Sequence, residues 1–442
     1  MTLAWQTFRI HLAHPRRGVA ARSYLLRYGK GSVYRFYSAA SVPSTSAVVV
    51  GAGPGGITVI GNLLEHGADQ RKVVWVDPCF RGGRVGSRYR EVPSNTKVSL
   101  FVQFANDVSP FKAIVQATPK PNALTALQEL PQDQGCRLGY AADMCLMLTD
   151  GLVVHPQVQT HRAKVTTATL DEKTNIWKVE FDHGGHVTTS KIALCTGSAP
   201  VSKNIPAIER MQESLNPVDL DVALTPSMLT NYFDPAARTT TVAVIGASHS
   251  AILVLMNLVN LANSTHPHLR VKWFTRNELR YAEYMDGWIL RDNTGLKGQA
   301  ADWARQNLDR DAFPNSAVSK VITKVWTAGN EEAAYKAELP ECTHLIQAVG
   351  YARNPLPDFK IIEKDDTTAR PLQVEYDDLN GRFYKKDDSK AEHGKQYVPG
   401  LFGAGIAFPE RVTDPRGNVE HAVGFWKFMK FVKKVAPDWV KS

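Results

Sequence analysis

The sequence predicts an α/β protein with two Rossmann-like domains. Two observations predict this class. Residues 47–50 and residues 242–245 have the pattern of short buried strands, and each run leads at once into a turn of small residues and then into an apolar, helix-like segment. Such a turn leaves the free N–H groups of the helix N-terminus pointing at a bound diphosphate. The two turns therefore predict two Rossmann-like dinucleotide-binding domains, with electron transfer between their ligands.

The first turn has glycine at Gly51, Gly53 and Gly56. Glycine at these positions allows the tight bend, the approach of the main chain to a pyrophosphate, and the close packing of the helix on the strand. The next predicted strand, residues 72–76, ends on Asp77, where a carboxylate accepts a hydrogen bond from a ribose 2′-hydroxyl. The alternative is a structural turn without a ligand.

The second turn carries the small residues Gly246, Ser248 and Ser250. The strand that follows it ends on Arg276, where the first domain has Asp77. A guanidinium pairs with a 2′-phosphate through two hydrogen bonds, whereas a carboxylate would repel it. The sequence thus predicts NADPH rather than NADH, with a solvated surface arginine as the alternative.

Two features beside the second turn each have two interpretations. His249 lies inside the turn, where it either contacts a phosphate or supplies a proton near neutral pH, or else packs on its neighbours. Residues 284–298 mix Tyr, Trp, Asp and Lys in a loop. We interpret this loop as facing the substrate, because loops of mixed character are often functional, and the alternative is a surface insertion.

Charge is concentrated at the N-terminal end of the chain. The formal net charge is +9, and residues 1–46 contain seven basic residues and no acid. The rest of the chain is therefore close to neutral, and no nucleic-acid-binding surface is predicted. Residues 1–44 have the Arg-rich, acid-free composition of a mitochondrial transit peptide, and Arg35-Phe-Tyr37 resembles a matrix-protease cleavage site. We predict the mitochondrial matrix, with a basic tail on a cytoplasmic protein as the alternative.

Neither the cysteines nor the apolar runs indicate a metal site or a membrane span. The five cysteines fall at no spacing typical of a redox pair or a metal site, and we predict no metal. They are Cys79, Cys136, Cys145, Cys195 and Cys342. No apolar run reaches the roughly 18 residues that a membrane-spanning helix needs.

The stretches between the two turns differ in pattern. Between the glycine-rich residues 81–87 and about residue 150, proline, glutamine and threonine are frequent, and we predict loops that cover a ligand. Residues 165–189 alternate in polarity around a turn at residues 182–185, which predicts a β-meander.

The order of these features resembles the FAD- and NAD(P)-dependent pyridine nucleotide oxidoreductases over nearly all of residues 45–442. The resemblance rests on both turns, the meander, the small-Thr-Gly turn at Thr196 and Gly197, and residues 345–351. It implies FAD in the first domain and an NADPH domain inserted into it, with three-layer ββα architecture. The implied boundaries are residues 45–204 and 340–442 for the FAD domain and residues 205–339 for the NADPH domain.

The C-terminal part follows the same resemblance. Residues 399–406 match the superfamily pattern for the last FAD-binding strand, which implies cofactor contacts at Gly403 and Gly405. Ile406 stands where reductases have an aspartate that binds the ribityl chain. From Gly417 onward we predict an amphipathic helix whose N-terminus points at the flavin, and whose apolar face packs on the domain or touches an anionic membrane.

Within the superfamily, the chain resembles flavin-containing monooxygenases more than disulfide reductases, because it has no redox-active cysteine pair. Residues 92–101 resemble the segment that lies along the flavin in those monooxygenases, which implies that Asn95 and Thr96 lie beside the flavin ring. The alternative is that Ser94 and Asn95 cap the next helix. The histidine-containing fingerprint of that family is missing, since residues 201–240 contain no histidine.

The leading hypothesis is a monooxygenase that takes hydride from NADPH through FAD and inserts one atom of O2 into a small amine or sulfur compound. One alternative passes the electrons to a quinone or another carrier. The other is an FAD-binding redox sensor without turnover. The predicted partners are the substrate and O2, and the sequence does not determine the oligomeric state.

Overall fold

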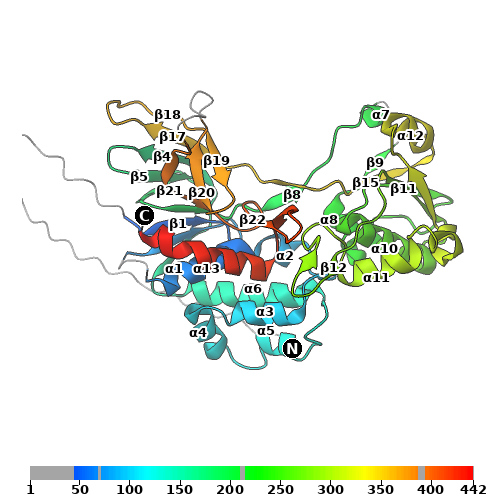
Figure 1. Ribbon diagram of the computed structural model, residues 1–442, viewed down its shortest axis with the longest axis horizontal. Coiled ribbons are helices and arrows are strands. Elements are labelled where there is room, and N and C mark those ends of the chain that lie inside the picture. Colours follow the sequence, from blue (N-terminus) through cyan, green and yellow to red (C-terminus); the bar gives the residue numbers. More distant parts are fainter. Residues whose placement is uncertain (1–43, 68–70, 210–214, 387–393, 442) are drawn as a thin grey trace, which may run out of the picture. The chain divides into compact units, whose positions relative to one another are not determined.

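The computed structural model describes residues 44–67, 71–209, 215–386 and 394–441. Nearly all of the predicted transit peptide lies outside the described residues, so the mitochondrial address stays a prediction. Residues 42–442 form one compact unit, which contains two lobes that are each built on their own sheet (Figure 1). We call the lobe with the first glycine turn the first lobe, and the lobe with the second turn the second lobe.

The first lobe is built on a seven-stranded sheet in the order β19-β20-β21-β7-β1-β2-β3. Its strands are β1 (Ala47–Val50), β2 (Val73–Val76), β3 (Val158–His161), β7 (Ile192–Leu194), β19 (Val374–Asp377), β20 (Arg382–Lys385) and β21 (Tyr397–Gly403). The strands from β21 to β3 pair in parallel, and β20 and β19 continue the sheet antiparallel. The valine runs of β1 and β2 suit this sheet, because both of its faces are covered.

A second sheet covers one face and helices cover the other (Figure 1). The second sheet consists of β18 (Arg370–Pro371), β17 (Asp358–Ile362), β4 (Val165–Asp171), β5 (Ile176–Phe181) and β6 (His186–Thr189). Val48 lies in the core between the two sheets, and its neighbour Val49 lies in the core with the helices, because alternate residues of a strand face opposite sides. The predicted meander and the three-layer ββα arrangement are confirmed for this lobe.

The stretch up to residue 150, predicted as loops, is largely helical. The helices on this face are α1 (Pro54–Glu65), α2 (Gly83–Ser87), α3 (Val98–Ala105), α4 (Ser109–Ala117), α5 (Ala123–Gln128), α6 (Leu138–Val153) and α13 (Phe425–Lys441). The loop prediction was wrong because it weighed polar composition over apolar spacing. Phe101, Phe104 and Phe111 are fully buried in the helical core, and Pro110 is accommodated in the first turn of α4.

The second lobe has a parallel sheet in the order β14-β11-β10-β15-β9, with helices on both faces. Its strands are β9 (Asn216–Pro217), β10 (Thr240–Ile245), β11 (Leu269–Thr275), β14 (Ile322–Trp326) and β15 (His344–Gln347), and β12 (Glu283–Tyr284) with β13 (Ile289–Leu290) forms a separate hairpin. Its helices are α7 (Pro206–Glu209), α8 (Leu220–Ala223), α9 (Pro226–Thr230), α10 (His249–Ser264), α11 (Gly298–Asn307), α12 (Glu331–Glu338), and the short η1 (Phe313–Asn315), η2 (Ala317–Lys320) and η3 (Leu339–Glu341).

Two details of the second lobe differ from expectation. Its third layer consists of α12 and α7, where the first lobe has a second sheet. Strand β15 pairs with β10 in parallel, so the second sheet extends beyond the predicted boundary at residue 339. The chain therefore returns to the first lobe after residue 347.

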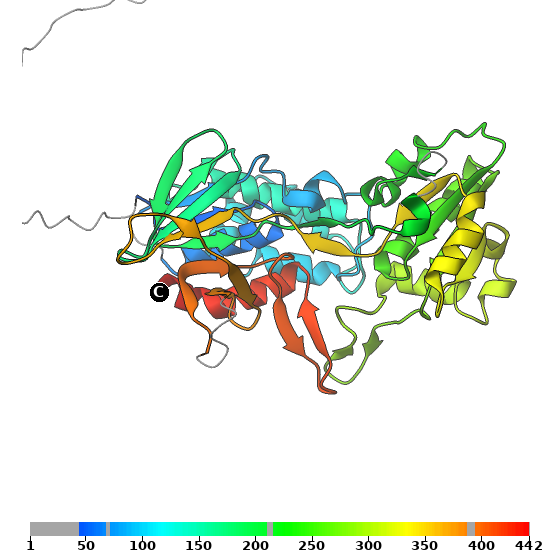
Figure 2. The same ribbon diagram turned by 90° about the horizontal axis from the view of Figure 1, so that it is seen from above.

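The two passages between the lobes run side by side. β8 (Ser198–Pro200) and β16 (Tyr351–Arg353) pair antiparallel, and Figure 2 shows them as adjacent green and gold strands. Asn354 donates from its backbone N to the Gly197 carbonyl (3.0 Å) and from Nδ2 to the Thr196 carbonyl (2.7 Å). The small-Thr-Gly turn is thus fixed to the returning strand.

The C-terminal helix begins later than predicted. Residues 417–424 do not start the helix, because β23 (Val419–Ala422) pairs with β22 (Glu410–Thr413) as a hairpin, and α13 begins at Phe425 after Gly424, whose φ is +142°. The apolar face of α13, including Met429 and Val432, is buried in the first lobe. In the part of the chain that the structure describes, each helix is too short or too polar to cross a membrane.

Candidate active site

The first turn is sterically restricted to glycine at two positions. Gly51 has a φ of +106°, and a Cβ at this residue would lie 2.3 Å from the Cys195 carbonyl oxygen. A Cβ at Gly56 would lie 1.8 Å from the Gly51 carbonyl oxygen. These contacts join β1, α1 and the end of β7 more closely than any side chain would allow.

Around the N-terminus of α1, three backbone segments come together. A Cβ at Gly55 would lie 2.9 Å from Cα of Gly405, and a Cβ at Gly83 would lie 2.9 Å from Cα of Gly53. Gly53 is the N-cap of α1 and provides no side-chain hydrogen bond to the N–H groups of the first turn. A cradle of bare backbone with free N–H groups fits a diphosphate, so the residues of this turn fit FAD.

Asp77 is bound to the turn itself. Its Oδ2 accepts from the backbone N of Ala52 (2.8 Å), and its Oδ1 accepts from the backbone N of Cys79 (2.8 Å) and of Phe80 (2.7 Å). These bonds fix the end of β2 against the glycine turn. Each carboxylate oxygen can accept more than one hydrogen bond. The geometry therefore permits the predicted hydrogen bond from a ribose hydroxyl to Asp77.

The other residues assigned to FAD by resemblance lie at two nearby strand ends. Thr196 Oγ1 is buried and has no hydrogen-bond partner among the described residues, which is unusual for a buried hydroxyl and fits a polar ligand. Gly403 is confined by Phe408, since a Cβ there would lie 2.8 Å from Cγ of the ring. Gly405 contacts the α1 turn as described, whereas the side chain of Ile406 is 44% exposed and contributes no polar group.

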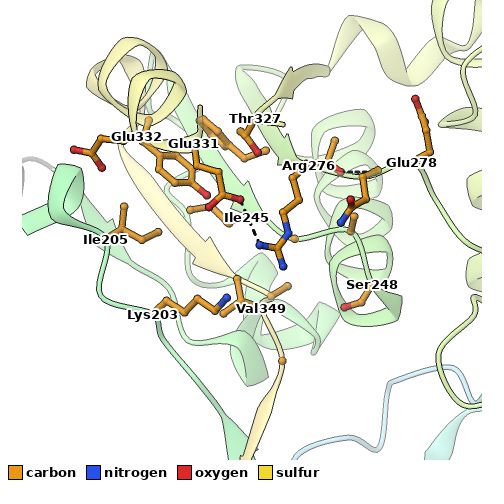
Figure 3. Close-up of a pocket in the computed structure, with 18 of the residues that line it drawn as sticks. Lys203, Ile205, Ile245, Ser248, Arg276, Glu278, Thr327, Glu331, Glu332 and Val349 are labelled. Atoms are coloured by element: carbon orange, nitrogen blue, oxygen red, sulfur yellow. Dashed lines mark hydrogen bonds and ion pairs between the residues drawn. The ribbon is translucent and has the colours of Figure 1, made fainter. Parts of the chain in front are cut away.

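The second turn lines a cavity of about 650 Å³ (Figure 3). This volume lies in the range typical of small-molecule and cofactor sites. Gly246 has a φ of +133°, and a Cβ there would lie 2.3 Å from the Ala348 carbonyl oxygen. Gly246, Ser248 and Arg276 line the cavity, and Arg276 pairs with Glu331 at 3.6 Å. The Arg276 side chain is 61% exposed, so solvent screens its pair with Glu331. These groups fit a phosphorylated dinucleotide.

A tryptophan hydrogen bond that was not predicted from the sequence occurs at both glycine turns. Trp75 of β2 donates from Nε1 to the Gly51 carbonyl (2.9 Å), and Trp273 of β11 donates from Nε1 to the Gly246 carbonyl (2.7 Å). Both indoles are fully buried. Each tryptophan stands near the end of the strand that follows a glycine turn, so the signal was present in the sequence as a second internal repeat.

Ser250 and His249 begin α10 but are not part of the cavity wall. His249 Nδ1 is buried without a partner among the described residues. Burial, with a smaller effect of the nearby Lys297 ammonium, lowers the pKa of His249 to about 4. The imidazole is therefore uncharged at neutral pH, which does not support the hypothesis of a proton source near neutral pH.

The low pKa of His249 predicts an acid-sensitive fold. Between about pH 6.5 and pH 4 the unfolded chain binds a proton that the folded chain excludes, so the free energy of unfolding falls as the pH falls, by about 2 to 3 kcal/mol over the window. Denaturant titrations at several pH values should show this slope for the natural protein and a smaller one for His249→Gln. The exposed His186→Gln is the control. An unchanged slope in His249→Gln would contradict the assignment.

Asn95 and Thr96 lie at the border of the two lobes. The N-cap of α3 is Lys97, without a side-chain hydrogen bond, so Ser94 and Asn95 do not cap this helix, and that alternative is wrong. Asn95 is exposed, and its Oδ1 accepts a long hydrogen bond of 3.5 Å from Thr96 Oγ1. A Cβ at Gly298 of the second lobe would lie 3.7 Å from the Cα of Asn95.

A polar contact between the lobes was not predicted. The buried Asp221 of α8 accepts hydrogen bonds from Arg84 of α2 and from the hydroxyl of Tyr89 (3.0 Å). Arg84 and Asp221 line a smaller cavity of about 350 Å³ beside the paired passages. Arg84 follows the glycine pair at residues 82–83, but nothing in the sequence indicates its partner, which lies far away in the chain.

Three comparisons place this geometry among known proteins. The model of a protein family described as FAD-NAD(P)-binding matches residues 48–199. The chain is 51% identical over 403 residues to the monooxygenase AgnR1 of Paecilomyces divaricatus, a match that covers 90% of this chain and 98% of the relative. Its fold is similar to the crystal structure of OTEMO with FAD bound, with a TM-score of 0.53, 14% identity, and coverage of 90% of this chain and 98% of the other.

The two lobes with their glycine turns, together with the matching family model and the relative at 51% identity, define an oxidoreductase that uses FAD and NAD(P)H. Within this class the chain belongs to the family of the monooxygenase AgnR1. The predicted superfamily, α/β fold class and monooxygenase activity are thereby confirmed. The roles of individual cofactor-binding residues stay predictions that rest on the geometry above.

Proposed function

We propose that this monooxygenase oxidises a small amine or sulfur nucleophile, with NADPH as the electron donor. In the balanced reaction, NADPH, a proton, O2 and the substrate give NADP⁺, water and the oxygenated product. The observation that carries the proposal is the contact of Gly298 with Asn95. It brings the segment predicted to lie beside the flavin against the loop whose Thr294 and Leu296 line the second cavity.

The chain's own residues account for binding and orientation. Gly51, Gly53 and Gly56 would let the FAD diphosphate approach the α1 N-terminus. Asp77 fixes the turn and would accept a hydrogen bond from the ribose. Bound FAD supplies the chemistry of hydride acceptance and oxygen activation, which no side chain can provide. With FAD bound, the primary amide of Asn95 would donate hydrogen bonds to the reacting oxygen, and the hydroxyl of Thr96 would assist it.

Arg276 supports NADPH as the coenzyme. It lies at the end of β11 in the cavity of the second turn, and Lys203 reaches into the same cavity from another element (Figure 3). Two cations near a 2′-phosphate favour the phosphorylated coenzyme. Glu331 holds Arg276 in the absence of ligand and would be displaced by the phosphate.

The test separates oxygen transfer from the two other hypotheses. The FAD-loaded protein is reduced with NADPH under nitrogen and then mixed with ¹⁸O₂ and either a tertiary amine or a thioether. We expect one ¹⁸O atom in the product by mass spectrometry. Reoxidation by a quinone but not by oxygen would instead support electron transfer to a carrier, and a flavin that NADPH does not bleach would support the sensor.

Asn95→Ala should separate oxygen consumption from product formation. Removal of the amide deletes hydrogen bonds to the reacting oxygen, so we expect the ratio of product to NADPH consumed to fall about tenfold, the effect of one or two lost hydrogen bonds. Hydrogen peroxide should rise in proportion, measured with a peroxidase assay. The exposed Asn315→Ala serves as the control, and unchanged coupling in Asn95→Ala would remove this residue from the mechanism.

A further inference from the structure

The loop of residues 291–298 connects the second cavity to the C-terminal part of the first lobe. On one side, Thr294 and Leu296 line the cavity. On the other side, Glu420 of β23 accepts three hydrogen bonds from the loop: from the backbone N (3.0 Å) and Nδ2 (3.1 Å) of Asn293 at Oε2, and from the Thr294 hydroxyl (2.5 Å) at Oε1. Figure 2 shows the orange-red β22–β23 hairpin approaching this part of the second lobe.

Two lysines complete the contact. Lys427 of α13 donates to Asp292 Oδ2 (2.6 Å) and to Asn293 Oδ1 (2.6 Å). Lys297 donates to Asp292 Oδ1 (2.7 Å) and to the Asp292 carbonyl (2.6 Å). The two ammonium groups thus share the Asp292 carboxylate. One belongs to the loop itself and the other to α13 of the first lobe.

The charges of this contact are balanced and shielded. Two acids face two lysines, so the group has no net charge that would attract a separate ion. Glu420 is 9% exposed and the Lys297 side chain 12% exposed, so the hydrogen bonds are shielded from competing water. Removal of one partner would leave buried groups unpaired, which is costly, and the loop is therefore held in one position.

What the contact holds in position is the wall of the second cavity. Thr294 is bonded through its hydroxyl to Glu420 and lines the cavity as well. Lys297 lies beside His249 of the second turn, and the next residue, Gly298, lies against Asn95. A shift of this loop would change the cavity and the border with Asn95 together.

We propose that Glu420 and Lys427 are positioning residues for the nicotinamide dinucleotide, although neither lies in the lobe that contains its cavity. They hold the loop of residues 291–298 so that Thr294 and Leu296 form the cavity wall. This inference rests on the proposed function, in which NADPH occupies that cavity. Because coupling between binding events is reciprocal, bound NADP⁺ in turn stabilises the contact of the loop with β23 and α13.

Glu420→Gln tests the proposal. The substitution keeps the size of the side chain but replaces one acceptor oxygen by an amide donor, so one or more of the three bonds is lost. We expect NADP⁺ binding to the FAD-loaded protein, measured by calorimetry, to weaken about 5- to 10-fold, and the KM for NADPH in anaerobic flavin reduction to rise by the same factor. The rate at saturating NADPH should stay within about twofold, since the loss of one contact can be overcome by ligand.

The matched control is Glu410→Gln. Glu410 lies on β22, which pairs with the β23 strand of Glu420. It pairs with Lys434 of α13 (2.9 Å), and both residues belong to the first lobe. The Glu410→Gln substitution should leave the affinity for NADP⁺ unchanged. Equal weakening by both substitutions would indicate a general effect of the hairpin and would overturn the assignment to Glu420.

Hydrogen exchange on the natural protein gives a second readout that does not depend on a variant. Saturating NADP⁺ should slow exchange in peptides covering residues 291–298 and 419–424, which contain the bonded amides of Asn293 and Val423. Binding of NADP⁺ without protection of either peptide, or binding unaltered by Glu420→Gln, would overturn this inference alone. A natural protein that binds no NADP⁺ would overturn the proposed function as well.

Discussion

Gly51→Ala is expected to yield a colourless protein of lower stability. The residue has a φ of +106°, where a methyl group is strained, and the added Cβ would lie 2.3 Å from the Cys195 carbonyl oxygen. Neither atom can move away cheaply, because the Cβ and the carbonyl oxygen are fixed to the backbone directly after β1 and β7, which pair in parallel. We expect a loss of about 3 kcal/mol or more from strain and overpacking together, and a loss of bound FAD because the turn must open.

Gly184→Ala separates the effect of backbone strain from that of overpacking. Gly184 also has a positive φ, +86°, but it lies in the turn between β5 and β6, where an added Cβ would meet no atom within 4 Å. The control should therefore show only the backbone strain, about 1 to 2 kcal/mol, and keep its flavin. Flavin absorbance per protein and thermal unfolding measure both effects. A yellow Gly51→Ala protein with the stability of the control would contradict the tight packing of this turn.

Arg276→Ala is expected to remove the preference for NADPH. A charge-assisted pair of hydrogen bonds to a 2′-phosphate contributes about 2 to 3 kcal/mol, so the KM for NADPH should rise about 30- to 150-fold. NADH has no phosphate at this position, and its KM should change little. The phosphate displaces Glu331, an exposed partner at 3.6 Å whose pair with Arg276 contributes little by itself.

The control for this substitution is Arg270→Ala, at the opposite end of the same strand. Arg270 is exposed and donates to the carbonyls of Pro267 and Leu269, away from the cavity. Anaerobic flavin reduction at several concentrations of each coenzyme gives the two KM values. Equal losses for NADPH and NADH in Arg276→Ala would withdraw the coenzyme assignment.

Features set by neighbouring residues were predicted correctly. β1, β10 and the turns after them follow from short apolar runs that meet glycine, and the meander of residues 165–189 follows from alternation and turn residues. In each case the conformation depends on contacts within a few residues. The position of Asp77 and Arg276 at the ends of corresponding strands was predictable for the same reason.

Features that depend on distant partners were missed. The helices α3, α4 and α5 are short, and their packing in the core with α1, α6 and α13 stabilises them. The helical pattern after residue 417 was extended too far, because the pairing of β23 with β22 cannot be read from the amphipathic sequence that follows. The end of the second domain was predicted at residue 339, but β15 extends its sheet to residue 347. This pairing of β15 with β10 joins strands that are distant in the chain.

The sequence by itself determined that this chain has two dinucleotide-binding turns, and it distinguished them by the residue at the end of the next strand. Those are local properties of backbone geometry and charge. Only the tertiary structure decided that Gly298 reaches Asn95 and that Glu420 and Lys427 hold the loop that lines the second cavity. These contacts join residues more than one hundred positions apart, and their energy comes from burial and pairing of groups that no local pattern brings together.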